Sequence, residues 1–374
     1  MMKILAIDTS CDETAVAITE GRKVLSNIIY SQILIHKKWG GVVPSLAKRA
    51  HQERIDWVIA EALRKFNQQN VILNDSEGSL ANASSNKLRD SSAKSQNDND
   101  MRKIDAIAVT YGPGLAVALE VGIAKAKELA KKYKKKLIAV GHMEGHIYAN
   151  FGQNAKGNPK REQEFPYLCL LISGGHTELV ILKNQIEYEV IGETIDDAAG
   201  EALDKAAKML GLGYPGGPVL ERLAREVENK DFHNFPRPMM QSKDLNFSFS
   251  GLKTALFYHL KRMSDEDKAK DLKELASSFQ EAVFDSLVKK LEKAIVQTKI
   301  NRLLVGGGVS ANMTIRNRLR ILMKKYDGEA IFPPYKYLCT DNAAMIGIAA
   351  SYHAEKGDFI RDLEKLDRVP RLRL

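Results

Sequence analysis

The sequence predicts an α/β protein built from two divergent copies of one unit. Residues 3–19 and 167–183 each contain two apolar runs around a short polar turn, which predicts a β-hairpin in each half of the chain. Each hairpin is followed by helical periodicity and then by an apolar strand that ends in glycines, at residues 104–115 and 302–309. Two such lobes facing each other, with glycine loops at the strand ends, would form a cleft suited to the phosphates of a nucleotide.

The order of the segments predicts where the two lobes divide. We expect the first lobe to cover residues 1–135 and the second to cover residues 136–374, with the last helices packing back on the first lobe. Residues 74–100 are rich in Ser, Asn, Asp and Lys, which predicts a disordered insertion. Apolar residues that recur three or four apart predict helices at about 46–67, 116–135, 197–210, 268–298 and 312–325.

Composition and charge narrow the class of protein. The 374 residues include 56 Lys and Arg against 47 Asp and Glu, a net charge of +9 that favours a polyanionic partner without proving one. No stretch approaches the roughly 20 uncharged apolar residues of a membrane span, and the N-terminus lacks a signal-peptide core, so we expect a cytoplasmic protein with no membrane contact. Cys11, Cys169 and Cys339 are odd in number and lack CxxC spacing, which predicts neither a disulfide framework nor a thiolate zinc site.

The densest basic segment is residues 125–136, where seven lysines face one glutamate. A solvated helix face and a phosphate-contacting surface explain this segment equally well on charge alone. Because the segment lies directly upstream of the strand that leads to His142, we expect it near the rim of the active-site cleft.

Two histidines, His142 and His146, stand four residues apart just after the apolar run at residues 136–141. On a helix both imidazoles point to one face and can share a metal ion, although two surface or capping histidines explain an isolated pair as well. In HMEGH, Glu144 lies roughly 200° round the helix from His142. This order differs from the HExxH of zinc proteases and argues against peptide hydrolysis.

A third metal ligand is offered by residues 339–345, where Thr340 or Asp341 also suits the N-cap of the helix that follows. The motif read by itself is explained by the cap alone.

Glycine turns at strand ends are candidate anion sites. The SGGHT turn at residues 173–177 lets backbone N–H groups approach an anion, although an ordinary hairpin turn has the same composition. Three consecutive glycines at residues 306–308 are harder to explain by packing and indicate backbone room for a nucleotide. Residues 195–205 place four acids at a helix start, as dipole-compensating caps or a solvated face, and residues 214–218 read as a turn or a close approach to ligand.

These segments, taken in order over residues 7–350, closely resemble the tRNA threonylcarbamoyladenosine transferase family, called TsaD in bacteria and formerly described as O-sialoglycoprotein endopeptidases. The SCDET turn resembles the bacterial and organellar branch. The matching strings are IDTSCDETAVAI, GGVVP, TYGPGL, GHMEGHIYANF, LLISGGHTELV, IGETIDDAAGEALDKAAKMLGLGYPGGP, FSFSGLKTAL, VGGGVSANMTIRNRL and TDNAAMIGIAA.

The resemblance implies a fold and a set of site residues. The fold is the actin-like, sugar-kinase and Hsp70-type (ASKHA) fold of two ribonuclease-H-like lobes. One divalent metal per subunit, Fe²⁺ ahead of Zn²⁺, is implied at His142, His146 and Asp341. Substrate contacts are implied at Leu171, Ile172, Ser173, Gly174, Gly175, Asp204, Gly217 and Asn312. We further expect donor or phosphate contacts at Ser10, Glu13, Gly307 and Gly308, and tRNA contacts at Lys131, Lys132, Lys134 and Lys135.

The resemblance also implies a reaction and partners. The N6 amine of adenosine 37, in a tRNA that reads codons beginning with A, attacks the carbamoyl carbon of L-threonylcarbamoyl-AMP and AMP is released. The metal would polarise the donor and the glycine loops would cradle the AMP portion. The implied partners are a TsaB paralogue and the TsaE ATPase, while a separate TsaC-type enzyme makes the donor.

Three departures from the family pattern stand out: Ser45 replaces the glutamate usual after GGVVP, Val117 fills a glycine position after GPGL, and the insertion at residues 74–99 is extra. Cys11 lies beside Asp12 and Glu13, which disfavour its thiolate and argue against a covalent role. The alternatives are an ATP-dependent phosphotransferase or ATPase of the same fold, a non-catalytic nucleotide-binding scaffold and, weakest, a metalloprotease.

Overall fold

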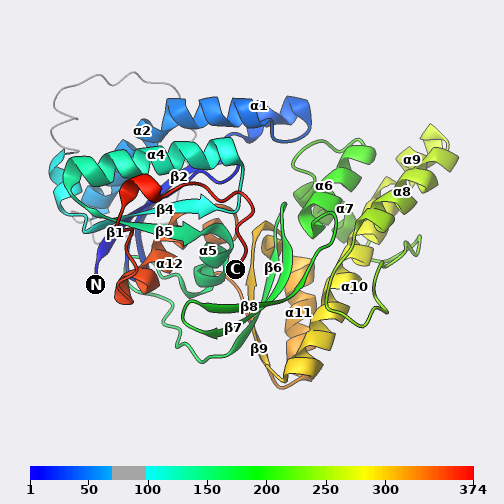
Figure 1. Ribbon diagram of the computed structural model, residues 1–374. Helices are drawn as coiled ribbons and strands as arrows, with labels where there is room; N and C mark the ends of the chain where they lie inside the picture. The colour runs from blue at the N-terminus through cyan, green and yellow to red at the C-terminus, as the bar shows by residue number, and fades with distance from the viewer. Residues whose placement is uncertain (70–97) are drawn as a thin grey trace. The chain divides into compact units, whose positions relative to one another are not determined.

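The computed structural model describes residues 1–69 and 98–374, and the chain divides into two compact α/β units (Figure 1). The first unit continues past the expected boundary at residue 135, because the strand at residues 136–141 pairs with the first sheet. The first unit contains Met1–Gln32, Val42–Arg161 and Asp341–Arg373, and the second contains Ile33–Gly41, Glu162–Thr340 and Leu374.

A five-stranded sheet in the order β3-β2-β1-β4-β5 forms the centre of the first unit. Strands β1 (Lys3–Asp8) and β2 (Glu13–Glu20) form the first predicted hairpin, and β3 (Lys23–Ser31) continues it antiparallel to β2. Strands β4 (Ala106–Gly112) and β5 (Lys136–Gly141) run parallel to β1. The carboxyl ends of β1, β4 and β5 therefore meet at one edge of the sheet.

The second unit repeats this arrangement. Its strands are β6 (Tyr167–Ile172), β7 (Thr177–Asn184), β8 (Glu187–Glu193), β9 (Arg302–Gly306) and β10 (Glu329–Ile331). They lie in the order β10-β9-β6-β7-β8, with β6, β7 and β8 antiparallel and β6, β9 and β10 parallel. Strand order and direction match the first sheet, so the predicted duplication is confirmed, although the sequence did not indicate β3, β8 and β10.

Five of the helices correspond to the predicted ones: α2 (Pro44–Gln69), α4 (Ala116–Tyr133), α6 (Ala199–Met209), α10 (Leu272–Thr298) and α11 (Met313–Lys325). The others are α1 (Ile33–His36), α5 (His142–Tyr148), α7 (Gly217–Glu226), α8 (Ser250–Arg262), α9 (Asp265–Lys270) and α12 (Ala343–Glu355). Short 3-10 helices occupy Lys37–Trp39, Ala149–Phe151, Gly308–Ala311 (η3), Lys336–Leu338 and Leu363–Lys365.

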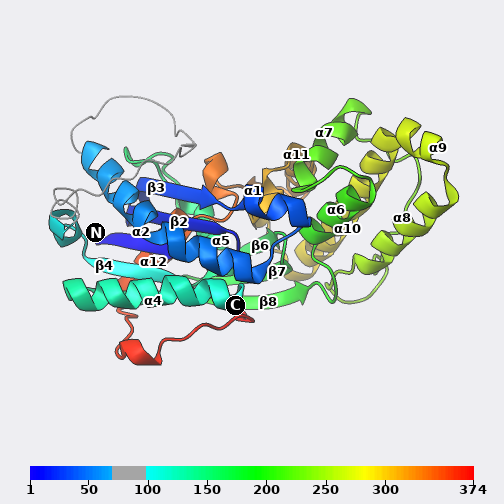
Figure 2. The ribbon, with the colours of Figure 1, turned by 90° about the horizontal axis from the view of Figure 1, so that it is seen from above.

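Helices cover both faces of the first sheet. Helices α2 and α4 lie side by side on one face, and α12 packs on the other face against β1, β2 and α5 (Figures 1 and 2). Apolar side chains of β1, β2 and β4 fill the space between the layers. The chain from α12 onward thus belongs to the first unit.

Most of the expected insertion at residues 74–100 lies outside the described residues. Its end differs from the expectation, because residues 98–102 are helical. Met101 is buried in the core of the first unit, and Asp98 accepts a hydrogen bond from Lys132 at 2.9 Å. These contacts order the chain again before β4 begins.

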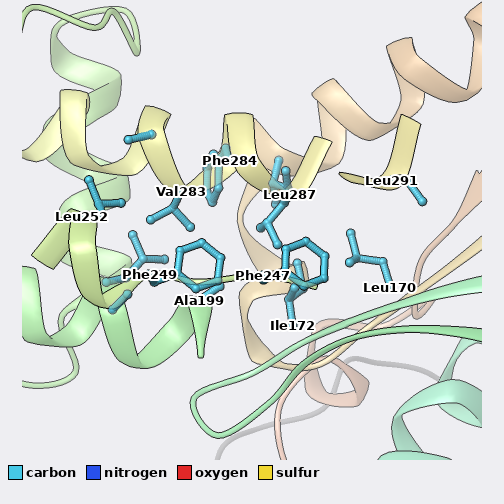
Figure 3. Packing of buried hydrophobic residues seen from close by; sticks show 14 of the residues in the cluster. Leu170, Ile172, Ala199, Phe247, Phe249, Leu252, Val283, Phe284, Leu287 and Leu291 are labelled. Atoms are coloured by element: carbon cyan, nitrogen blue, oxygen red, sulfur yellow. The ribbon is translucent and has the colours of Figure 1, made fainter. Parts of the chain in front are cut away.

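The core of the second unit lies between its sheet and α10. Phe247 and Phe249 lie beneath Val283 and Leu287 of α10, and the other side of the cluster carries Ile172 of β6 (Figure 3). Each fully buried side chain of this size contributes about 2 kcal/mol of transfer free energy. This packing holds α10 in place and, with it, the strand ends described below. No helix of the described residues is long and apolar enough to cross a membrane.

Candidate functional site

Two histidines and an aspartate meet at the carboxyl edge of the first sheet. Helix α5 starts directly after β5, so His142 is its first residue and His146 lies one turn on, on the same face. Nε2 of His142 is 3.4 Å, and Nε2 of His146 is 3.3 Å, from Oδ1 of Asp341. The structure thus brings together the three residues implied as metal ligands, which we call the His-His-Asp triad.

The start of α12 explains why Asp341 faces the histidines. The expectation that Thr340 or Asp341 caps α12 is wrong, because Oδ1 of Asn342 accepts the capping hydrogen bond at 3.0 Å. The carboxylate of Asp341 therefore remains directed at the imidazoles. A Cβ on Gly145 would lie 2.9 Å from Cδ1 of Ile346, so glycine permits the close packing of α5 on α12.

The atoms of the triad fit a metal ion. One donor atom from each residue lies within 4.8 Å of the others. His146 is fully buried, and within the described part of the chain no hydrogen bond reaches either of its ring nitrogens or Nδ1 of His142. Leaving such buried atoms unpaired costs about 1–3 kcal/mol each. Two imidazoles and a carboxylate suit Fe²⁺ and Zn²⁺ alike, so the donor set favours a divalent transition metal without choosing between them.

Electrostatics at the triad are dominated by burial and by two carboxylates. Burial acts to lower the pKa of His142, but Asp341 and Asp8 outweigh it and hold that pKa well above its usual value. Burial acts to raise the pKa of Asp341, yet His142 and His146 hold it well below its usual value. The pKa of His146 is lowered, first by burial. A bound cation would take the place of the proton that His142 holds.

Asp8 is a site residue that the sequence reasoning missed. It ends β1, is fully buried, and places Oδ2 3.6 Å from Nδ1 of His142. Carboxylates behind metal-binding histidines fix the tautomer and the ring orientation. The available signal was a lone acid at the end of an apolar strand.

Glu144 serves the helix start rather than the triad. Its Oε2 accepts a hydrogen bond from the backbone N–H of Gly141 at 3.2 Å, and its Oε1 pairs with Nε2 of His353 at 2.9 Å. Nδ1 of His353 in turn pairs with Asp358 at 2.8 Å. These contacts agree with the argument against a zinc-protease base at this position.

The turn after β1 carries Ser10, Cys11 and Glu13. Ser10 is buried, and Gly114 packs so closely on it that a Cβ there would lie 2.5 Å from the Ser10 carbonyl oxygen. Burial, then Asp12, raises the pKa of both Cys11 and Glu13. The Cys11 thiol therefore stays protonated at neutral pH, as expected for a residue with no covalent role.

In the second unit, four glycines have an ordinary backbone φ and open space where a Cβ would lie. Neither backbone conformation nor packing within the chain explains the choice of glycine at such positions. Room for a ligand beside the backbone is the remaining physical reason. The four are Gly174, Gly175, Gly217 and Gly308, all of them predicted substrate or donor contacts.

Neighbouring glycines are required by the fold instead. A Cβ on Gly307, whose φ is +88°, would lie 2.4 Å from the carbonyl oxygen of Ile172. A Cβ on Gly200 would lie 2.5 Å from that of Ser173. These contacts bring η3 and the start of α6 against the end of β6. Leu171 and Ile172 are fully buried strand residues, so only their backbone can meet a ligand.

Asp204 and Asn312 position loops. Oδ1 of Asp204 accepts hydrogen bonds from the N–H groups of Gly216 at 2.7 Å and Gly217 at 3.0 Å. Oδ1 of Asn312 caps α11, and its Nδ2 donates to Oε1 of Gln280 at 3.0 Å. Both were expected to contact substrate, whereas most of their hydrogen-bonding capacity is used within the chain. Gln280, in the middle of α10, carried no sequence signal.

The lysine segment lies away from the triad. It precedes the first residue of β5, whereas His142 follows the last, and a six-residue strand separates the two by roughly 20 Å. The expectation that closeness in sequence places it beside the ligand histidines therefore fails. Lys131 pairs with Glu364, and Lys132 pairs with Asp98 at 2.9 Å, while Lys134 ends α4. Part of the positive charge is thus balanced within the chain.

Two sheets of the same strand order, a buried His-His-Asp triad and open glycine loops define a two-lobed protein of the ASKHA type with a candidate metal centre. The fold is similar to that of HypF from T. kodakarensis, with a TM-score of 0.52 and 14% identity over 72% of this chain and 44% of that chain. Full-length HypF in a phosphate- and nucleotide-bound form gives a TM-score of 0.52 and 13% identity over 95% of this chain and 55% of that chain. At such identities the similarity concerns the fold alone.

The model of the TsaD family, described as tRNA N6-adenosine threonylcarbamoyltransferase, matches residues 23–72 and 91–348. Relatives of that name share 43% identity over 373 residues in Thermosipho africanus, covering 100% of both chains, and 45% over 369 residues in Thermodesulfovibrio yellowstonii, covering 97% of both. The chain belongs to the TsaD family, a family of acyltransferases. The resemblance seen in the sequence is confirmed, and the phosphotransferase, scaffold and protease alternatives are set aside.

Proposed function

We propose that this chain transfers the threonylcarbamoyl group from L-threonylcarbamoyl-AMP to N6 of adenosine 37, in tRNAs that read codons beginning with A, with release of AMP. The observation that carries the proposal is the full-length similarity to relatives named tRNA N6-adenosine threonylcarbamoyltransferase. The net charge of +9 suits a polyanionic substrate. We place the reaction in the cytoplasm, together with a TsaB paralogue and the TsaE ATPase.

The reaction makes one C–N bond and breaks one C–O bond. The N6 amine of the adenosine attacks the carbamoyl carbon, the bond from that carbon to the phosphate oxygen breaks, and AMP leaves with the electron pair. Negative charge grows on the carbonyl oxygen and on the leaving phosphate, so positioning and electrostatic stabilisation are the contributions required of the protein.

The His-His-Asp triad would hold one divalent metal, Fe²⁺ or Zn²⁺, which supplies Lewis acidity toward an oxygen of the donor when bound. His142 and His146 offer neutral imidazole nitrogens once the shared proton leaves, and Asp341 offers an ionised carboxylate. Asp8 holds the ring of His142 from behind. Within this unit the chain's own task is to present three ligands in a dry, fixed arrangement.

The open glycine loops of the second unit would take the adenylate. Backbone N–H groups near Gly174, Gly175 and Gly308 can approach a phosphate because no Cβ stands in the way. Oγ of Ser173 accepts hydrogen bonds from the N–H groups of Gly175 and His176, at 3.3 and 3.0 Å, which sets the shape of the turn. Asp204 does the same for the turn at Gly217.

The test combines product analysis with metal analysis. Purified chain is incubated with tRNA, bicarbonate, threonine, ATP, the TsaC-type enzyme, TsaB and TsaE, and nucleosides are measured by mass spectrometry. Replacing His142 or His146 with Ala should remove bound metal and lower transfer at least about 100-fold, as loss of Lewis-acid stabilisation predicts. Met143→Leu on the same helix is the matched control and should change neither value.

Two results would contradict the proposal. One is the absence of threonylcarbamoyladenosine although partners from a related organism complete the reaction with their own transferase. The other is steady ADP formation by the chain alone, without tRNA, which would favour the ATPase alternative.

A further inference from the structure

A second group of metal-donor atoms lies in the second unit, on residues that the proposed reaction does not use. His233 lies in the loop between α7 and α8, Asp271 directly precedes α10, and Glu274 lies in the first turn of α10. One donor atom from each of the three lies within 4.8 Å of the others, the same bound that holds for the His-His-Asp triad. We call this group the His-Asp-Glu cluster.

One atom of the cluster has no partner in the chain. Nε2 of His233 is buried, and within residues 1–69 and 98–374 no hydrogen bond reaches it. An imidazole nitrogen in this state costs free energy unless a ligand satisfies it. The unpartnered nitrogen is directed at two carboxylates rather than at an apolar wall.

The two carboxylates are also uncommitted. Asp271 occupies the N-cap position of α10, but its side chain makes no capping hydrogen bond. Among the described residues neither Asp271 nor Glu274 forms an ion pair with Lys or Arg, whereas the neighbouring Lys273 pairs with Glu226 at 2.9 Å. Three residues apart at a helix start, the two carboxylates share one side of the helix.

The loop that carries His233 is held firmly. Oδ1 of Asp231 accepts a hydrogen bond from the N–H of His233 at 3.2 Å, and Oγ of Ser278 accepts from the same N–H at 3.2 Å. Arg237 pairs with Asp231 at 2.6 Å. The ring of His259, from α8, lies edge-on with its centroid 4.8 Å from that of His233. The imidazole is therefore preorganised by residues that are not ligands themselves.

A simpler explanation covers only part of this arrangement. Acids at the start of a 27-residue helix compensate its dipole, which accounts for Asp271 and Glu274. It does not account for a buried imidazole nitrogen held between them without a hydrogen bond.

We propose that His233, Asp271 and Glu274 form a second binding site for a borderline divalent cation such as Zn²⁺, which fastens the loop around residue 233 to the start of α10. Two carboxylates balance the charge of the ion, and water completes the coordination. Ligand atoms about 2.0–2.2 Å from a tetrahedral ion lie about 3.4 Å from one another, so side-chain rotation alone can close the cluster around it.

The experiment uses the full chain with the first site removed, by Asp341→Asn together with His146→Ala. Zn²⁺ is titrated in competition with a chromophoric chelator, and retained metal is measured by elemental analysis after dialysis. This background should hold about one Zn²⁺ per chain. Adding either His233→Gln or the pair Asp271→Asn and Glu274→Gln should weaken Zn²⁺ binding at least about tenfold, as loss of a ligand predicts.

The matched control is the pair Asp265→Asn and Glu266→Gln at the start of α9, which removes two first-turn acids that do not belong to the cluster. It should leave Zn²⁺ binding unchanged. The proposal is overturned if the background chain retains no Zn²⁺, or if Zn²⁺ binds equally well in the control and in both cluster variants. Circular dichroism confirms folding, and if His233→Gln does not fold, the carboxylate pair decides.

Discussion

Nδ1 of His142 faces Oδ2 of Asp8 at 3.6 Å, while Nε2 of the same ring lies 3.4 Å from Oδ1 of Asp341. One imidazole is thus held between two buried carboxylates from strands and helices far apart in the chain. The inner carboxylate orients the ring and the outer one joins it in the His-His-Asp triad.

Replacing Asp8 with Asn should lower metal affinity by about 10–100-fold, the usual effect of losing a carboxylate behind a ligand histidine. The shape of the side chain is kept, so folding should persist. Competition with a chelator, followed by elemental analysis, measures the change. Glu20→Gln, at the end of β2, is the control. Unchanged metal affinity in Asp8→Asn would show that Asp8 is only a buried structural acid.

Gly307 and Gly308 are neighbours with opposite expected roles. Ala at Gly307 must adopt a φ near +88° and meet the carbonyl oxygen of Ile172, so we expect a loss of about 1–3 kcal/mol of stability. Ala at Gly308 meets open space, so stability should hold while affinity for the adenylate falls. Thermal unfolding and calorimetric titration with AMP separate the two effects. Gly251→Ala, in α8, serves as a control, and a Gly308 variant with wild-type affinity would remove this loop from the binding site.

His353 should make stability depend on pH. Burial acts to lower its pKa, but Glu144 and Asp358 outweigh burial and raise that pKa above its usual value near 6.5. The stabilisation is therefore fully present below about pH 6.5 and is lost as pH rises through the raised value. Tyr111 also faces these acids, and burial raises its pKa.

Denaturant unfolding of His353→Gln should consequently show a larger loss of stability relative to the wild type at pH 6 than at pH 9. Glu144→Gln should flatten the same pH dependence, and the double variant should add little. A loss in His353→Gln that is equal at both pH values would mean that the histidine is uncharged in the folded state.

The lysine segment offers a test of how tRNA is held. Lys131 and Lys132 are paired with acids in the chain, so we expect Lys134→Gln with Lys135→Gln to have the larger effect on tRNA binding. Each lost phosphate contact should reduce the salt slope by roughly one counterion. Filter binding between low and moderate salt measures the slope, with Lys131→Gln and Lys132→Gln as the comparison. Wild-type slopes in both pairs would leave the segment as a solubilising helix end.

Local pattern alone carried much of the architecture. Alternating apolar residues with a polar turn predicted the hairpins of β1–β2 and β6–β7, and helical periodicity predicted α2, α4, α6, α10 and α11. The spacing of His142 and His146 placed both on one face of a helix. Asp341 and the individual substrate contacts came from the resemblance to the family, not from spacing. These features are local, or were carried in whole motifs, so the linear chain contains them.

Only the tertiary structure showed what lies behind and between these residues. Parallel pairing of β1 with β4 and of β4 with β5 brings Asp8 to the same sheet edge as His142. The same strand, β5, holds the lysine segment at the other end, which closeness in sequence misrepresented. The His-Asp-Glu cluster likewise joins a loop to a helix start that no spacing relates. Periodicity reports how a residue sits on its own element, whereas strand direction and register decide which distant side chains share an edge.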